Sequence, residues 1–181
     1  MKVSREQVSQ HKIRVLDAAG RLFRERGFDN VTVGEIMTAA GLTHGAIDGH
    51  FPSKDGLLAE AIAYGVTPAP SDKPKPAAAY ADSYLSVKHR DNRAGGCNFA
   101  GLGTEAARGS PELRHAMTES LERQIQRFAN ASAGKTAQEK RRAGILAWSA
   151  MVGAVMLSRI ADDEKLSQEI LTETRKALKF A

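Results

Sequence analysis

The sequence predicts an all-α protein with a small N-terminal domain and a larger C-terminal domain. Apolar residues recur at the three- and four-residue spacing of a helix, and no segment keeps the alternating pattern of a strand. Helix start signals, in which Ser or Thr is followed three residues later by Glu or Gln, recur along the chain. The hydrophobic fraction of 42% is ordinary for a globular protein and too high for a disordered one.

We expect the first helix over about residues 4–26. Ile13, Leu16 and Phe23 form the apolar stripe of a helix with one buried face, and Gly27 is the residue type that commonly ends a helix. Three shorter helices should follow, over residues 32–41, 43–51 and from 53 through 62. Pro52 separates the last two, because proline disfavours a helical residue before it.

The helices expected over residues 32–41 and 43–51 have the spacing of a helix-turn-helix. The tight turn is Gly41-Leu42, and the helix after it begins with small or hydrogen-bonding residues: Thr43, His44, Gly45 and Ala46. A recognition helix presents its N-terminal residues to base edges in the major groove, and its N-terminus attracts a phosphate. On spacing alone, a three-helix bundle without a ligand is the alternative.

A proline-rich stretch divides the chain. Four of the six prolines lie between Pro68 and Pro76, which predicts a linker and places the domains at residues 1–65 and 76–181. In the second domain we expect helices over about 77–89, 98–108, 110–128, 136–160 and 163–180. The fourth is apolar over most of its circumference, so it should be buried on several sides.

Charge is unevenly distributed. Residues 1–26 carry a net charge of +4 and residues 27–62 a net charge of −4, within a total of +5. This balance permits a polyanionic partner without proving one.

Other features exclude several classes of protein. One cysteine excludes an internal disulfide framework and a multi-cysteine metal site, and five scattered histidines indicate no metal or cofactor. No nucleophile–base pair suggests an enzyme. No uncharged apolar run reaches about 18 residues, and the first ten lack a signal core. We therefore expect a cytoplasmic protein that does not bind a membrane.

Four runs resemble the DNA-binding domain of the TetR family of bacterial regulators over residues 10–62. They are IRVLDAAGRLFRERGF (13–28), TVGEI (32–36), AGLTHG (40–45) and HFPSKDGLL (50–58). The resemblance implies an all-α homodimer that binds a near-palindromic operator. It further implies that a small-molecule effector binds the C-terminal domain and releases a repressor from DNA. The last two helices would pair with those of the partner.

The resemblance also assigns DNA-contacting positions: Thr32, Thr43, His44, Gly45, Ala46, His50 and Lys54. One position departs from the family, which usually has a tyrosine that contacts a phosphate where this chain has Asp48 after Ile47. A carboxylate there would repel a phosphate. Alternatively, Asp48 accepts a hydrogen bond from a cytosine amino group, or a basic residue of the first helix neutralises it.

The segment 96–108 resembles one branch of the family, in which some members sense electrophiles or oxidants through a cysteine. Cys97 is then either a reactive thiolate near a helix N-terminus or a small buried residue, and we favour the second. Candidate effector-pocket residues are Cys97, Leu102, Met117, Leu121, Trp148, Met151, Val152 and Val155. At helical spacing such residues are also typical of a core or a dimer interface. An all-α ligand-binding protein with a weakened DNA-binding domain is the remaining alternative, as is a redox sensor acting through Cys97.

Overall fold

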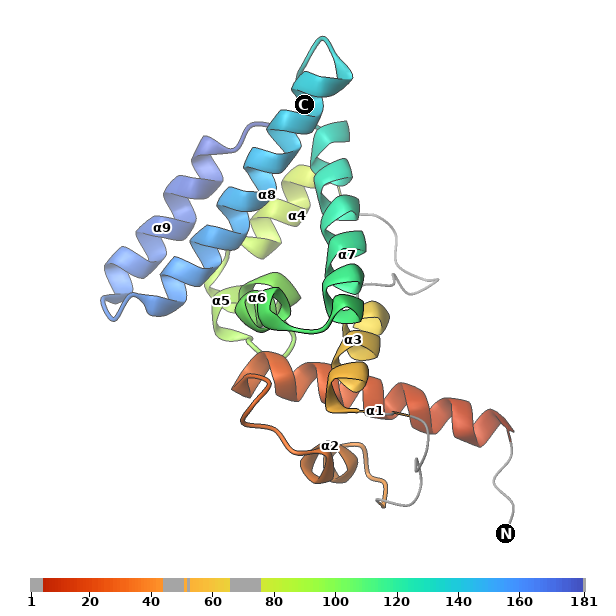
Figure 1. Cartoon of the computed structure of the whole chain (residues 1–181). Coiled ribbons are helices and arrows are strands. Elements are labelled where there is room, and N and C mark those ends of the chain that lie inside the picture. Colours follow the sequence, from red (N-terminus) through yellow and green to blue (C-terminus); the bar gives the residue numbers. More distant parts are fainter. Residues whose placement is uncertain (1–4, 44–50, 52, 66–75, 181) are drawn as a thin grey trace.

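The computed structural model describes residues 5–43, 51, 53–65 and 76–180 (Figure 1). In this part of the chain all regular structure is helical, which confirms the predicted fold class. The helices are α1 (Arg5–Arg26), α2 (Val33–Ala39), α3 (Lys54–Gly65), α4 (Ala77–Tyr84), α5 (Val87–Asp91), α6 (Asn98–Arg108), α7 (Pro111–Asn130), α8 (Ala137–Ile160) and α9 (Glu164–Ala177). The expected helix over 43–51 lies largely outside the described residues.

The helices form two groups. Helices α1 to α3 lie at one end of the molecule, and α7, α8 and α9 form the body of the other (Figure 1). Helix α8 packs along both α7 and α9, while α7 also packs on α3 and α6 lies against both α1 and α8. The second group therefore rests on the first through α6 and α7.

Helix boundaries follow the predicted signals closely. Thr32 and Glu35 form a complete capping box at the start of α2, and Thr136 and Glu139 form another at the start of α8. Helix α1 stops at Gly27, whose φ of 80° is a conformation that glycine adopts without strain.

The single helix predicted over 77–89 is wrong, because the structure has two short helices there. Leu85 leaves the helical conformation with ψ of 57°, and Ser86 starts α5 by accepting a hydrogen bond from the backbone N–H of His89. The His89 ring nitrogen Nδ1 lies 2.7 Å from the carbonyl oxygen of Tyr84 and so satisfies the end of α4. The predicted last helix over 163–180 is also shorter, because Leu178 is already extended.

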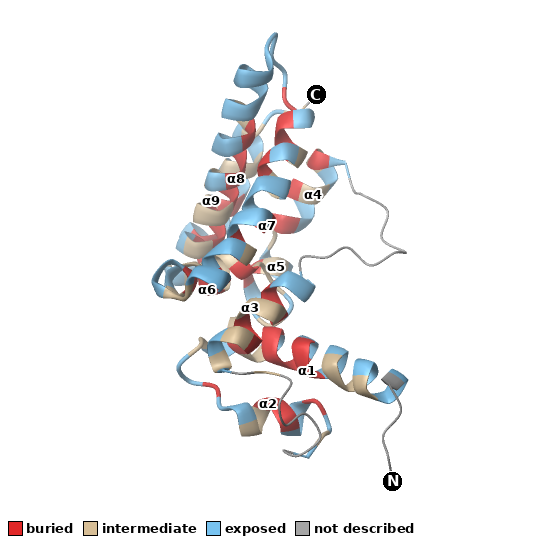
Figure 2. Cartoon of the chain, turned by 45° about the vertical axis from the view of Figure 1, so that its right-hand side comes forward, coloured by how far each residue is buried: buried red, intermediate tan, exposed pale blue. Residues whose placement is uncertain are grey.

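The first hydrophobic core is mainly aliphatic and includes residues from both sides of the predicted domain boundary. Its N-terminal members include Phe23 on α1 and Leu58 on α3, with Ile36 from α2. Helices α6 and α7 complete it with Leu102, Ala106, Leu113 and Met117. Figure 2 shows the buried part of α1 directly beneath α3. The predicted boundary between residues 65 and 76 therefore does not coincide with a boundary between the two cores.

The second core is rich in aromatic residues and lies between α4, α7, α8 and α9. Phe128, Met151 and Val155 are completely inaccessible to solvent, and Trp148 is nearly so. Helix α8 is long and apolar enough to cross a membrane by length and composition alone. In this structure its inner side packs into the second core instead, against α7 and α9.

Candidate DNA-binding surface and C-terminal core

Helix α2 begins with an exposed hydrogen-bonded corner. The Thr32 hydroxyl accepts from the N–H of Glu35 at 3.2 Å, and the Glu35 carboxylate accepts from the N–H of Thr32 at 2.8 Å. Arg26 also donates to this carboxylate at 2.8 Å. These bonds, first those from Thr32 and then that from Arg26, lower the pKa of Glu35 to about 2.

The turn after α2 is held by its own backbone and by α1. Gly41 has a φ of 66°, and the N–H of Leu42 donates to the carbonyl of Met37 at 3.0 Å. Arg14 on α1 donates to the Gly41 carbonyl at 3.3 Å. A Cβ at position 41 would lie 2.6 Å from the Arg14 guanidinium, so glycine also makes this contact possible. The chain thus enters residue 43 in a fixed direction.

The structure places three of the predicted DNA-binding residues. Thr32 and Thr43 are exposed and line one shallow hollow beside α2. Lys54 starts α3, with its ammonium 4.3 Å from the centre of the Phe28 ring. His44, Gly45, Ala46, Asp48 and His50 lie outside the described residues.

The predicted effector-pocket residues do not converge on one place. Leu102 and Met117 belong to the first core, whereas Trp148, Met151 and Val155 belong to the second. Cys97 and Val152 are partly buried against the second core, and Leu121 is 36% exposed on α7. Only the group around Trp148 therefore stays together as a candidate pocket wall.

Aromatic rings surround Trp148. Phe128 stacks on it with ring centres 6.0 Å apart, Phe99 meets it edge-on at 5.6 Å, and Tyr84 lies 5.3 Å away. Its indole N–H is buried and has no hydrogen-bond partner among the described residues. Sequence reasoning missed Tyr80 and Tyr84, although their four-residue spacing places them on one helix face.

Cys97 is the N-cap residue of α6. Burial raises the pKa of its thiol, although Tyr84 and the N–H groups of Ala100 and Phe99 act in the opposite direction. A raised pKa favours the unreactive protonated thiol over the thiolate.

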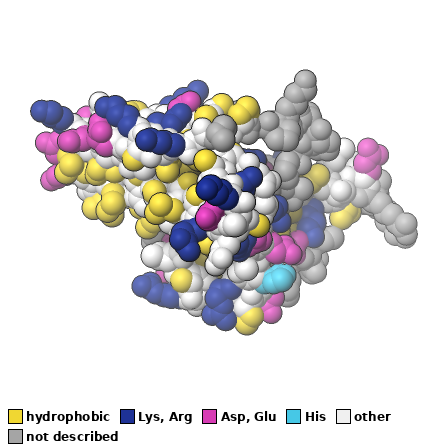
Figure 3. Space-filling view, turned by 90° about the horizontal axis from the view of Figure 1, so that it is seen from above, with side chains coloured by type: hydrophobic (Ala, Val, Ile, Leu, Met, Phe, Trp, Pro, Cys, Tyr) yellow, Lys and Arg dark blue, Asp and Glu magenta, His cyan; other side chains and the backbone are white. Residues whose placement is uncertain are grey.

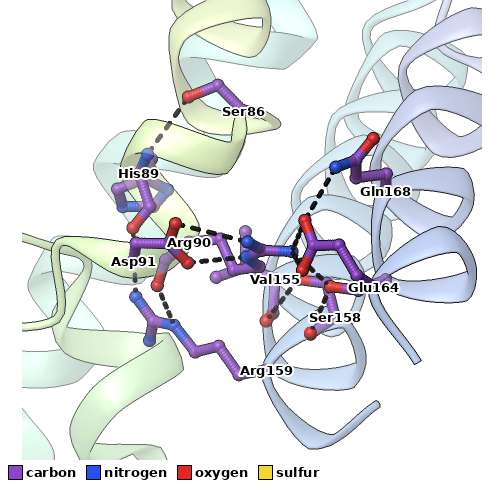
Figure 4. A network of polar contacts seen from close by, with 10 residues as sticks. Ser86, His89, Arg90, Asp91, Val155, Ser158, Arg159, Glu164 and Gln168 are labelled. Atoms are coloured by element: carbon purple, nitrogen blue, oxygen red, sulfur yellow. Dashed lines mark hydrogen bonds and ion pairs between the residues drawn. The ribbon is translucent and has the colours of Figure 1, made fainter. Parts of the chain in front are cut away.

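A polar network links α5, α8 and α9 (Figure 4). The buried Arg90 donates to Asp91 at 2.7 Å, to Glu164 at 3.0 Å and to the Ser167 hydroxyl at 2.7 Å. The Ser167 hydroxyl in turn donates to the carbonyl of Ser158 at 2.6 Å. No sequence pattern pointed to this network, because α5 lies far from α8 and α9 in the sequence.

Comparison with known families agrees with the N-terminal geometry. Residues 15–61 match the model of the bacterial regulatory proteins of the tetR family. The N-terminal region of this chain is therefore similar to the DNA-binding region of the TetR family. The match covers α2 and the turn after it, together with the parts of α1 and α3 that form the first core. The matched family is described as one of bacterial regulatory proteins.

Two curated TetR-family relatives align over the same N-terminal region. The HTH-type transcriptional regulator AcrR of Shigella flexneri is 39% identical over 57 residues, which are 32% of this chain and 26% of that protein. An HTH-type transcriptional repressor of Mycobacterium tuberculosis is 40% identical over 57 residues, which are 32% of this chain and 30% of that protein. The alignments thus span less than a third of these relatives.

Solved structures extend the likeness to the whole TetR-family fold. The reduced form of Escherichia coli NemR has a TM-score of 0.72 at 18% identity, over 94% of this chain and 97% of that one. A TetR transcriptional regulator from Chloroflexus aurantiacus has a TM-score of 0.72 at 22% identity, over 94% of this chain and 95% of that one. The C-terminal helices therefore share the fold, while their sequence has diverged.

Proposed function

We propose that this protein is a DNA-binding transcriptional regulator that acts as a repressor. The observation that carries the proposal is the helix and turn over residues 32–43, built as a fixed support for the residues that follow and matched by the tetR family model. In a helix-turn-helix, the recognition helix follows such a turn. The basic charge of α1 adds attraction for the phosphate backbone.

The proposed assembly is a homodimer that pairs through α8 and α9. These helices expose Leu146, Leu157, Ile160 and Leu166, with 49% to 74% of each residue accessible. Figure 3 shows hydrophobic side chains gathered on the side of the molecule where α8 and α9 lie. A contiguous apolar patch on a soluble protein marks an interface, and a stable one buries more than about 1,200 Å².

Sedimentation tests the assembly. We expect wild-type protein at micromolar concentration to sediment as a dimer and Leu157→Glu to sediment as a monomer. Val87→Glu is the control, because Val87 is 39% exposed on α5, which is not one of the two helices proposed to pair. A wild-type monomer would contradict the proposal.

The proposed control of DNA binding is a shift between two dimer states. Without effector, the dimer holds two recognition helices about 34–36 Å apart, at successive major grooves. An effector bound in the C-terminal core, beside Trp148, favours a dimer in which the recognition helices are spaced differently. The effector can shift this equilibrium only by as much as its affinities for the two states differ.

Nuclease protection on DNA upstream of the protein's own gene tests this function. We expect one protected segment containing two half-sites related by two-fold symmetry, with centres about one helical turn or a multiple of it apart. Uniform protection along the fragment, or none, would contradict an operator-binding regulator.

A second candidate function is a ligand-binding sensor with weakened DNA binding. Asp48 and the net charge of −4 over residues 27–62 favour it. If Asp48 only repels phosphate, Asp48→Tyr tightens binding to all DNA. Counted once for each protomer of a dimer, the gain in affinity reaches about a thousandfold. If Asp48→Tyr and Asp48→Asn instead weaken binding to the operator alone, the residue is a specificity contact.

A further inference from the structure

One arginine of the N-terminal domain is bonded directly to the C-terminal domain. Arg24, near the end of α1, donates from Nε to the carbonyl of Ala94 at 2.8 Å and from Nη1 to Oδ1 of Asn98 at 3.0 Å. Both acceptors lie in the α5–α6 segment, which we define as residues 89–100. Because the guanidinium is planar and its two bonds end on two different groups, Arg24 fixes both the distance and the relative orientation of α1 and this segment.

The Arg24 side chain lies at ordinary van der Waals distance from two glycines. Its side-chain carbons pass Gly101, where an added Cβ would lie 3.5 Å from them, and its guanidinium passes Gly65, where a Cβ would lie 3.9 Å away. Burial lowers the pKa of Arg24, more than the nearby Asp17 raises it. Its two bonds go to neutral acceptors, so the position depends on their placement and not on a carboxylate.

The same segment is held from the opposite side by α8. Arg159 donates to the carbonyls of Arg90 at 2.9 Å and His89 at 3.3 Å (Figure 4). It also donates to the carbonyl of Ala100 at 3.4 Å. Helix α8 also carries Trp148 in the second core and the exposed Leu157. The α5–α6 segment therefore lies between an arginine of the DNA-binding helices and an arginine of the helix that forms core and surface.

We propose that Arg24 is a positioning residue that sets the orientation of the DNA-binding helices relative to the C-terminal domain. When α8 moves, Arg159 displaces the carbonyls to which it is bonded, and the α5–α6 segment moves with them. The two acceptors of Arg24 lie in this segment and therefore also move. A change in the second core thus reaches α1 without any contact between the core and DNA. The orientation claim stands on the contacts alone, while its effect on DNA rests on the proposed function.

The test measures orientation without DNA. In a Cys97→Ser background, fluorescent labels are placed through Ser9→Cys on α1 and Arg123→Cys on α7, both at exposed positions. Labelled chains are diluted into excess unlabelled chains, so that energy transfer reports the distance within one chain. Arg24→Ala is compared with Arg21→Ala, an exposed arginine one turn earlier on the same helix.

We expect one narrow distance distribution for wild type and Arg21→Ala, and a shifted or broadened one for Arg24→Ala. Arg159→Ala should change the distribution in the same direction. The double variant Arg24→Ala/Arg159→Ala should show a smaller change than the sum of the two single changes. Asn98→Ala, which leaves the bond to Ala94, should give a smaller change and serves if Arg24→Ala does not fold. Unchanged distributions in folded variants, with only a lower melting temperature, would overturn the proposal by reducing Arg24 to a packing role.

DNA binding is a separate readout. If the protein binds its operator, Arg24→Ala should weaken that binding by at least about tenfold, and Arg21→Lys should leave it unchanged. If wild type binds no operator, the proposed function fails, and the distance measurement still decides the role of Arg24.

Discussion

The two cores of this molecule differ in composition and in how they use the chain. The first is mainly aliphatic and draws on both predicted domains, since residues of α6 and α7 such as Leu102 and Leu113 complete a core otherwise built from α1, α2 and α3. The second is aromatic and contains the buried indole N–H of Trp148, which no described residue accepts from. A buried polar group without a partner costs free energy, whereas a close-packed aliphatic core holds one arrangement.

This difference indicates that the two cores have different roles. The first core joins helices α1 to α3, which we propose bind DNA, to α6 and α7, so the two sets of helices move together. The second core has unsatisfied polarity that a ligand can satisfy. A change there is passed to α6 and Arg24 across the α5–α6 segment.

The largest expected effect tests the shared core. Leu102→Ala removes a completely buried side chain and should lower the free energy of unfolding by about 2–5 kcal/mol. Hydrogen exchange should show lost protection in α1 and α3 as well as in α6. Leu121→Ala, a leucine 36% exposed on α7, is the control and should cost much less. Loss of protection confined to α6 would contradict a core shared between the domains.

The next prediction compares two helical glycines. A Cβ at Gly144 would lie 2.6 Å from the carbonyl oxygen of Ile125 and 2.7 Å from the backbone nitrogen of Ala129. Gly144→Ala must therefore separate α7 from α8 and should destabilise by about 1–3 kcal/mol. A Cβ added at Gly103 on α6 would meet no described atom of another element within 4 Å, so Gly103→Ala should stabilise by about 0.4–1 kcal/mol. Equal melting temperatures for the two variants would refute the close packing of α7 on α8.

The two capping boxes provide a matched pair. Thr32→Ala and Thr136→Ala each remove a hydroxyl that accepts from the third backbone N–H of a helix, and each should cost about 1 kcal/mol. Only Thr32 is a predicted DNA contact. Operator affinity should therefore fall for Thr32→Ala and stay unchanged for Thr136→Ala, as measured by fluorescence anisotropy at fixed salt. Equal affinities would remove Thr32 from the DNA-binding surface.

The smallest effect is a dependence on pH. The pKa of Glu35 is lowered from 4.5 to about 2 in the folded protein, so its contribution is complete above pH 4.5 and is lost as the pH falls towards 2. Glu35→Gln should lower the melting temperature at pH 7 more than at pH 3. A difference that is the same at both pH values would show that the ionised carboxylate is not what stabilises α2.

Local signals made most of the fold predictable. Capping boxes at Thr32 and Thr136, the Ser-Pro start of α7 and the stop at Gly27 act within a few residues, and each marks a real boundary. The break after Tyr84 was missed because it depends on Leu85 and on the His89 ring closing the end of α4.

The candidate sites were less predictable because they depend on long-range packing. The helix-turn-helix lies within one stretch of sequence, so spacing and resemblance identified it. Leu102 and Trp148 have similar apolar patterns, yet packing assigns them to different cores. Arg24 and Arg159 resemble other surface arginines in sequence, and only the fold brings their acceptors within reach.

The DNA affinity of the full chain shows whether this protein is a sequence-specific DNA-binding regulator. Fluorescence anisotropy at about 0.15 M salt would compare a duplex from upstream of the gene with a scrambled duplex of the same composition. We expect at least about 10³-fold tighter binding to the upstream duplex. Equal affinity for both duplexes would contradict a sequence-specific regulator and leave only the attraction of a basic surface for a polyanion.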